Sequence, residues 1–406
     1  MPPLTENKAK EGDNLYPFND LNDRVFTDEG RREYEKNYVP PSFTIKELRD
    51  SIPSHLFKKS LLWSSLYTIF DIIVVSILFA SALQIRNLPT LLQPISWITY
   101  WFIQGVFMTG IWVIAHECGH QAFCDSKTIN NAVGFVLHTS LLVPYHPWRI
   151  SHAKHHASTG HIDEDQVFVP FKQTPENPKV AAYSAWEEAW DTAPIRPLYN
   201  VFVMLFVGWP GYLTFNASGQ DYGRYTSHFH PTSPIFKPEQ YRQVVASDIG
   251  LAVVFSILAY FTYTCGFQQV MAYYGIPYLF VNAWLVLITF LQHTDVYVPH
   301  YNPETWNFVR GALTTVDRDF GTFLNWALHH INDSHVAHHL FSQMPHYNAL
   351  EATKYLKEKL GPYYLNDNTN FLYSLYRSAK ECQFVDATQD VMFPRRINWD
   401  ELKKQD

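Results

Sequence analysis

Long apolar runs separated by polar segments dominate the pattern of the chain. Leu61–Leu83 and Pro94–Ala115 are each long enough to cross a bilayer core, which takes roughly 20 helical residues. Three further apolar runs follow at Leu198–Phe215, Ile249–Cys265 and Tyr278–Leu291. The pattern therefore predicts an all-α integral membrane protein.

Shorter segments are predicted to lie at the membrane surface. Thr44–Arg49 has an amphipathic pattern and His55–Lys59 follows it, so both fit interfacial helices, although ordinary surface helices fit equally well. Asn131–Tyr145 is apolar but too short for a crossing, which favours an interfacial or re-entrant helix. Asp71, the one charge in the first run, is costly in lipid and is expected to face the protein interior.

The amino-acid composition supports a membrane protein and limits the classes of binding partner. Hydrophobic residues make up 47% of the chain and aromatic residues 16%, whereas charged residues make up only 17%. The formal net charge of −7 gives no reason to expect a nucleic acid partner. The 4 cysteines form no C-x-x-C pair, so the simplest interpretation is that their thiols are reduced and lie in the cytosol or face it.

The two ends of the chain are predicted to be cytosolic. Residues 1–42 carry mixed charge and several prolines, which is typical of a flexible tail, and no signal-peptide pattern opens the chain. Lys403-Lys404 near the C-terminus resembles a dilysine signal for retrieval to the endoplasmic reticulum. A solvated tail without such a signal fits the same residues. We expect a membrane domain over 43–360 and a cytosolic C-terminal segment over 361–406.

Three histidine clusters carry the chemistry. Their spacings of i, i+3 and i+4 bring imidazoles onto one helical face, where one metal ion can take several of them. The first cluster alone also fits the H-E-x-x-H helix of a zinc protease, with its glutamate as general base. The eight box histidines are His116 and His120; His152, His155 and His156; and His335, His338 and His339.

The number of histidines decides against a protease-type zinc site. A catalytic zinc takes three protein ligands, and a mononuclear iron with two histidines and a carboxylate takes no more. Eight imidazoles fit two metal ions with about four or five ligands each. Imidazole suits zinc, copper and iron alike, but the clusters lie at the ends of apolar helices, where a hydrocarbon substrate would arrive. Oxidation of an unactivated C–H bond favours iron, because zinc has no redox chemistry.

Membrane topology follows if the three clusters build one site, because they must then lie on one face of the membrane. Two crossings precede the first cluster, and an even number must separate the second from the third. Gly208-Trp209-Pro210-Gly211 is expected to interrupt the run Leu198–Phe215, which we therefore take as embedded but not spanning. The prediction is four transmembrane helices plus interfacial helices, with both termini cytosolic and a cytosolic helical cap holding the metal site.

The clusters and their surroundings resemble the membrane-bound fatty acid desaturases, and in particular the fungal acyl-lipid delta-12 desaturases. The likeness covers about residues 43–360. Besides the histidine boxes, it rests on Leu142–Tyr145, Asn216–Asp221, Leu291–Asp295 and Asp317–Gly321. It implies conversion of oleoyl to linoleoyl chains on phospholipid at a di-iron centre, with molecular oxygen as co-substrate. It further implies electrons from cytochrome b5 and its reductase, and a multi-pass protein of the endoplasmic reticulum membrane.

The resemblance also assigns roles to individual residues. It implies that the eight box histidines ligate iron, together with His293 near the end of the last apolar run; His329 is a weaker candidate for that role. Arg149, Lys154 and the basic C-terminal stretch are candidates for docking an electron donor. Carboxylates expected to hold imidazole N–H groups are Glu117, Asp163, Asp165, Asp317, Asp319 and Asp333. Histidines expected to be structural are His138, His146, His161, His228, His230, His300 and His346.

Several alternatives stay open at this point. An omega-3 (delta-15) desaturase or a dual enzyme shares the boxes, although Val336-Ala337 resembles the delta-12 form. A fatty acid hydroxylase or acetylenase differs from a desaturase by few substitutions. An inactive lipid-binding relative would be expected to lack box histidines, and none is missing here. From another class, an intramembrane zinc metalloprotease would bind one zinc ion.

Overall fold

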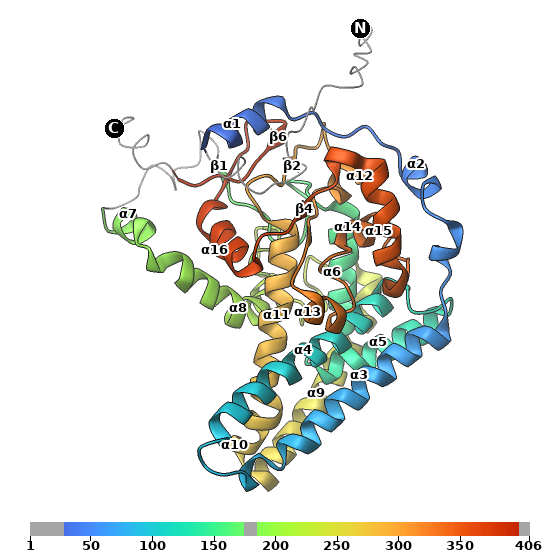
Figure 1. Cartoon of the computed structure of the whole chain (residues 1–406), viewed down its shortest axis with the longest axis vertical. Coiled ribbons are helices and arrows are strands. Elements are labelled where there is room, and N and C mark those ends of the chain that lie inside the picture. Colours follow the sequence, from blue (N-terminus) through green and yellow to red (C-terminus); the bar gives the residue numbers. More distant parts are fainter. Residues whose placement is uncertain (1–27, 174–184, 398–406) are drawn as a thin grey trace, which may run out of the picture.

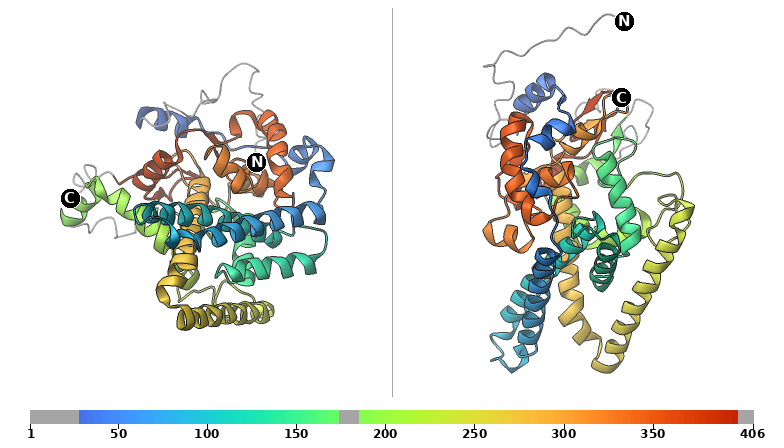
Figure 2. Two further views of the ribbon diagram at one scale, coloured as in Figure 1. Left: turned by 60° about the horizontal axis from the view of Figure 1, so that its bottom comes forward. Right: turned by 90° about the vertical axis from the view of Figure 1, so that its right-hand side faces the viewer.

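Two antiparallel helix pairs extend from one side of a helical head (Figures 1 and 2). The computed structural model describes residues 28–173 and 185–397. The first pair is α3 (Leu61–Ala82) and α4 (Gln93–Gly119), and the second is α9 (Tyr241–Cys265) and α11 (Ile276–His293). These four helices correspond to four of the predicted apolar runs, so the prediction of a mostly helical membrane fold is confirmed.

α4 and α11 are the inner helices of the two pairs. Their most apolar windows are 72% and 56% buried, whereas those of α3 and α9 are 17% buried and leave apolar side chains exposed, as lipid-facing helices do. Gly105 allows the two inner helices to approach closely, since a Cβ atom there would lie 2.4 Å from the Cβ of Phe280. The two helices that carry His116 and His293 are therefore packed directly against each other.

A short irregular connection closes the far end of the second pair. α9 ends at Gly266, whose φ of 92° suits glycine, and α10 (Phe267–Val270) and a π-helical turn (Met271–Gly275) lead into α11. Side chains of α4 bind this turn: Tyr100 donates a hydrogen bond to the carbonyl of Tyr273 at 2.9 Å. The two pairs are thus linked at the end away from the head.

α8 (Ile195–Phe215) lies to one side of the two pairs, beside α11 and α16 (Figure 1). The expectation that Gly208–Gly211 interrupts this helix is wrong, because the helix continues through Pro210 and ends at Asn216 in the left-handed conformation, with φ of 55°. The ring of Pro210 removes one backbone donor, which neighbouring packing and the nearby helix end make tolerable. Five of the described helices are long and apolar enough to cross a membrane, α8 among them. The count of four spans therefore stays a prediction.

The head consists of short helices and three pairs of two-residue strands. α5 is too short for a crossing, as expected, and packs against α4. The helices of the head are α1 (Asp28–Asn37), α2 (Ile45–Asp50), α5 (Lys127–Ser140), α6 (Tyr145–Ser158), α12 (Phe308–Ala312), α13 (Thr322–Ala327), α14 (His335–Leu340), α15 (His346–Leu360) and α16 (Phe371–Glu381), and α7 (Ala185–Thr192) precedes α8. The parallel pairs are β1 (Lys172–Gln173) with β5 (Val385–Asp386) and β3 (Asp317–Arg318) with β4 (Asn366–Asp367); β2 (His300–Tyr301) pairs antiparallel with β6 (Val391–Met392).

The N-terminal prediction needs a correction within the described residues. Residues 28–37 were expected to belong to a flexible tail, but they form α1, which packs on the head. Tyr34 is buried and donates to the carbonyl of Tyr297 at 3.3 Å, and the hydroxyls of Tyr38 and Tyr301 lie 2.6 Å apart. Residues 1–27 of that tail, and the lysine pair at 403–404, lie outside the described residues.

A buried hydrogen-bonded pair and a buried ionic cluster fix the head to the helices. Asp71 faces the protein interior as predicted: its Oδ2 lies 2.6 Å from Nε2 of His329, next to Gly110 of α4. The ionic cluster joins the end of α11 to β3, β4 and α16. Arg318 pairs with Asp295 at 2.7 Å and with Asp367, and Arg377 bridges the same two carboxylates. Each charge in this cluster has opposite partners, which offsets the cost of burying it.

Candidate metal centre

Four helices bring the predicted histidines to one place. α4 ends with His116 in its last turn and His120 at its C-cap, and α11 ends at His293. α6 carries the second cluster and α14 the third, in each case on one helical face as the i, i+3, i+4 spacing predicts. The nine histidines expected as ligands therefore converge from separate parts of the chain.

The nine histidines divide into two groups. The ring nitrogens of the first group lie within 4.8 Å of one another, and those of the second group do likewise. The ninth histidine, His335, joins the second group because its Nε2 lies 3.2 Å from Nε2 of His293. The first group is His116, His120, His152, His156 and His338, and the second is His155, His293 and His339. Five and four imidazoles are the numbers expected for two metal ions.

The arrangement of the ring nitrogens fits bound cations. Nε2 atoms face each other at 3.2 Å for His116 and His120, at 3.1 Å for His152 and His156, and at 3.3 Å for His155 and His293. Two nitrogens that bind one ion at about 2.0–2.1 Å adopt such a separation. In addition, the Nε2 atoms of His338 and His339 are buried without a hydrogen-bond partner. The residues present therefore fit two metal ions.

Burial also prepares the imidazoles for metal binding. It lowers the pKa of His152, His156 and His338 well below the ordinary histidine value, and the neighbouring imidazoles lower it further. These side chains are therefore neutral at physiological pH. A neutral imidazole offers the lone pair that a metal requires, so no proton has to be displaced when the metal binds.

Two carboxylates lie beside the Nδ1 atoms of the histidines. Asp165 lies 2.6 Å from Nδ1 of His155 and also accepts the backbone N–H of Gly160 at 2.8 Å. Glu117 lies 3.2 Å from Nδ1 of His116 and 3.6 Å from Nδ1 of His338, so it lies between the first and the third histidine cluster. The hydrogen bond between His155 and Asp165 fixes the orientation of the His155 ring and selects the tautomer that leaves Nε2 free. The expectation is confirmed for Asp165; for Glu117 it stays a prediction, because both of its carboxylate oxygens and Nδ1 of His116 are buried without a hydrogen-bond partner.

The other expected carboxylates have different partners. Asp163 pairs with Lys172 at 2.5 Å near the surface. Asp317 accepts the backbone N–H of Val336 at 2.8 Å, which places the third cluster through the main chain, and burial raises the pKa of Asp317 to about 7. Asp319 caps a turn at Gly321, and Asp333 contacts His330 rather than a box histidine.

Among the histidines considered as further ligands or as structural residues, none of those described joins either group. His329 is held by Asp71, so it is not brought to the metal positions. His138 is packed between Trp112 and Trp148, with ring centroids 5.0 and 4.7 Å away. His228 contacts Ser151 at 3.0 Å, and burial lowers the pKa of His228 to about 4.

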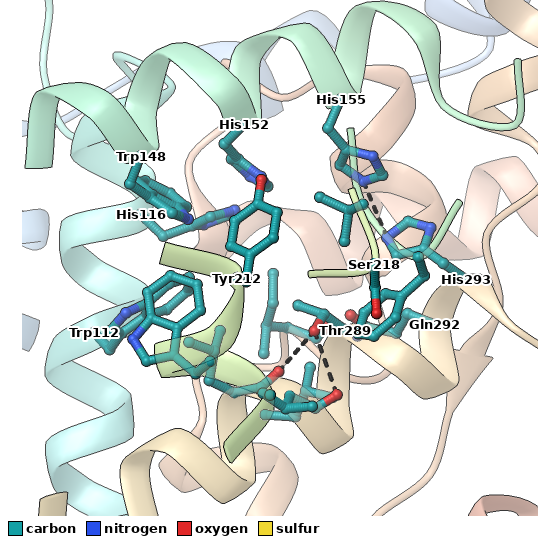
Figure 3. A pocket seen from close by; sticks show the side chains of 18 of the residues that line it. Trp112, His116, Trp148, His152, His155, Tyr212, Ser218, Thr289, Gln292 and His293 are labelled. Atoms are coloured by element: carbon teal, nitrogen blue, oxygen red, sulfur yellow. Dashed lines mark hydrogen bonds between the residues drawn. The ribbon is translucent and has the colours of Figure 1, made fainter. Parts of the chain in front are cut away.

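A narrow cavity of about 100 Å³ opens on the histidines. Figure 3 shows His116, His152, His155 and His293 around one part of it, with Tyr212 of α8 and Thr289 of α11 nearby. A dry cavity of about 150 Å³ holds one benzene molecule, so this space suits a single apolar segment. Apart from the histidines, its lining comes mainly from α4, α8 and α11 and carries no charged side chain.

Sequence reasoning did not name the residues that line this cavity. One signal was available for the lining residues of α4 and α11, because each of these helices ends in a candidate ligand. Val113 and Thr289 precede the candidate ligands His116 and His293 by about one turn, and Thr109 and Val286 precede them by about two. Tyr212 and Gly208 carried no such signal, because α8 holds no ligand and its position beside α11 is a result of tertiary packing.

The family model for fatty acid desaturases matches residues 95–371, which is more than half of the chain and includes all nine histidines. The chain belongs to the fatty acid desaturase family.

Similar curated proteins are desaturases from fungi and plants. The Delta(12) fatty acid desaturases of Mortierella isabellina and Mortierella alpina are each 50% identical to this chain over 369 residues, covering 89% of this chain and 92% of theirs. The "Omega-6 fatty acid desaturase, endoplasmic reticulum isozyme 1" of Glycine max is 43% identical, over 86% of this chain and 88% of its own. This desaturase is therefore similar to its relatives over most of its length.

Proposed function

We propose that this desaturase is an oxygen-dependent oxidoreductase that converts oleoyl to linoleoyl chains on phospholipid, a delta-12 fatty acid desaturase. The main support for the proposal is that nine histidines form two groups and that an uncharged cavity between apolar helices opens on them. A centre of this kind suits an apolar substrate that arrives from the membrane. The names of the similar Mortierella proteins supply the bond position.

Two iron ions are the proposed cofactors. The first group of five histidines would hold one and His155, His293, His335 and His339 the other. When bound, the iron pair would supply the activation of molecular oxygen that removal of hydrogen from unactivated methylenes needs. The identity of the metal rests on the family and on the redox argument, since imidazole itself suits several metals.

The chain's own residues position the reactants. The apolar walls of the cavity exclude water and restrict an acyl chain to one path past the histidines. Asp165 holds the Nδ1 proton of His155, which keeps Nε2 directed at the metal position. Gln292 donates to the carbonyl of Ile331 at 2.6 Å and thereby holds the segment before the third cluster against α11.

The cellular setting is part of the proposal. Four crossings with both termini cytosolic would place the head, and with it the metal centre, on the cytosolic side of the endoplasmic reticulum membrane. Electrons would come from cytochrome b5 and its reductase. Of the two residues expected to dock the donor, Lys154 donates to the carbonyl of Ile235 at 2.5 Å and Arg149 donates to Gln243 at 2.8 Å, so some of their N–H donors are already in use within the protein. We retain the division into 1–42, 43–360 and 361–406 as a working proposal.

Two measurements test this function. Expression in a host that stops at oleate should yield linoleate in the membrane lipids, measured by gas chromatography. A product with a double bond nearer the methyl end, or a hydroxylated chain, would move the assignment to an omega-3 desaturase or a hydroxylase. The purified protein should contain close to two iron ions per chain by elemental analysis; one zinc ion would contradict the di-iron proposal.

A further inference from the structure

The far end of the cavity differs chemically from the end at the histidines. Beyond Thr289 the cavity is lined by apolar side chains such as Met204, Leu285 and Val286. The two threonines in this part donate within their own helices, Thr109 to the carbonyl of Gly105 at 2.7 Å and Thr289 to that of Leu285 at 2.9 Å. The lining there carries no charged side chain that would compensate a buried phosphate.

The direction of the acyl chain follows from this difference. The carboxyl side of an acyl lipid carries the ester and the head group, which need water or polar partners. The histidine end is bordered by Ala217 and Ser218, which are exposed residues of the loop after α8. The polar part of the substrate therefore belongs at that end, and the methyl part at the far end.

We propose that the far end of the cavity receives the methyl-terminal segment of the acyl chain, and that Gly208 determines how long that segment can be. The proposal rests on the desaturase function given above. Gly208 lies on α8 opposite Val286 of α11, and Val286 precedes His293 by seven residues, which is roughly 10 Å along a helix. A methyl end that extends this far beyond the metal centre reaches the part of the cavity wall that Gly208 and Val286 form.

Residue 208 has no side chain that projects from this part of the wall. A Cβ atom added there would lie 3.7 Å from Cγ1 of Val286 and 3.8 Å from Cγ of Met204, both lining residues. These are ordinary contacts, so alanine fits without moving the backbone, and its methyl group occupies space in this part of the cavity. The larger side chain of valine would occupy more of this space. An acyl chain with two more carbons at its methyl end should lose this space first.

Gly211 of the same helix provides a matched control. A Cβ atom at Gly211 would meet only the Cβ of Ala217 at 3.5 Å, and Gly211 does not line the cavity. Both glycines flank Trp209-Pro210, so replacement by alanine changes helix propensity similarly at the two positions. A difference between Gly208→Ala and Gly211→Ala therefore reports on the cavity.

The experiment compares two substrates in the full-length protein. Wild type, Gly208→Ala, Gly208→Val and Gly211→Ala are expressed in a host that contains both palmitoleoyl and oleoyl lipids, and the two dienoic products are measured by gas chromatography alongside immunoblots of the membrane fraction. Gly208→Ala should lower the 18-carbon product relative to the 16-carbon product by about tenfold, the effect of one methylene-sized change in an apolar pocket. Gly208→Val should lower it further, and Gly211→Ala should leave the ratio unchanged.

Other outcomes overturn the inference. An equal loss of both products in Gly208→Ala means that Gly208 does not contact the methyl end, and the same ratio change in Gly211→Ala means that α8 acts through its backbone. If Gly208→Val is missing from the membrane, the alanine variant decides the question alone. Failure of the proposed function is distinguishable, because wild type would then yield neither dienoic product.

Discussion

Asp165 Oδ1 lies 2.6 Å from Nδ1 of His155, while Nε2 of the same ring lies 3.3 Å from Nε2 of His293. The imidazole of His155 is thus held on one side by a carboxylate and directed on the other side at the second group of histidines. Asp165 is itself fixed by three backbone N–H groups, those of Gly160, Gln166 and Val167. Ring orientation at this metal position is therefore built into the turn that follows α6.

Replacement of Asp165 should weaken this metal position without removing a ligand. Asp165→Asn cannot accept the Nδ1 proton with a charge, so we expect a loss of about 10–100-fold in activity or metal affinity. The measurements are iron content of the purified protein and linoleate formed in cells. Asp163→Asn is the control, since Asp163 pairs with Lys172 near the surface. Equal losses in the two variants would contradict a specific role of Asp165.

His155→Ala should abolish the dienoic product while the protein remains in the membrane. His155 is one of the four imidazoles proposed to hold the second ion, so its loss would leave that ion without one of its few ligands. Iron content should fall from close to two ions toward one. His330→Ala is the control, because His330 contacts Asp333 and belongs to neither group. Retained product in His155→Ala would exclude this histidine as an essential ligand.

Asp71 should prove important for stability rather than for metal binding. The pair with His329 is buried between α3, α4 and the segment after α13, and removal of one partner leaves the other polar group buried without this hydrogen bond, which costs about 1–3 kcal/mol. Asp71→Ala should therefore lower the thermal midpoint in detergent by several degrees, whereas Asp50→Ala in the exposed pair with Lys46 should leave it unchanged. Normal stability of Asp71→Ala, combined with loss of iron, would indicate a role at the metal centre instead.

The cluster around Asp367 predicts a loss of stability in acid. Burial alone would raise the pKa of Asp367, but Arg318, Thr369 and Arg377 outweigh it and lower the pKa to about 2. An unfolded aspartate titrates near pH 3.9, so this carboxylate contributes about 2 kcal/mol above that pH and loses the contribution as pH falls toward 2. Unfolding midpoints measured between pH 6 and pH 2 should show this decline. Asp367→Asn should be less stable at neutral pH and should decline less in acid.

Much of the candidate site could be predicted because the histidines within each box are close in sequence. The spacings within His152–His156 and His335–His339 place imidazoles on one face of a helix wherever that helix lies, and the apolar runs before and between the boxes require a membrane. Asp71 was predictable for the same reason, since a charge in an apolar run has to find a partner in the protein. These features depend on helix periodicity and on the cost of burying charge, and both can be read without a fold.

What only the tertiary structure decided are the relationships between distant segments. The division of the histidines into five and four depends on how α4, α6, α11 and α14 cross, and so does the choice of His293 over His329, which Asp71 holds elsewhere. The course of α8 through Pro210, and its place as a wall of the cavity, likewise follow from packing against α11 and α16. Local periodicity determines which face of a helix carries a residue. Which other helix meets that face is determined by the packing of the whole chain, because contacts between segments hundreds of residues apart leave no period in the sequence.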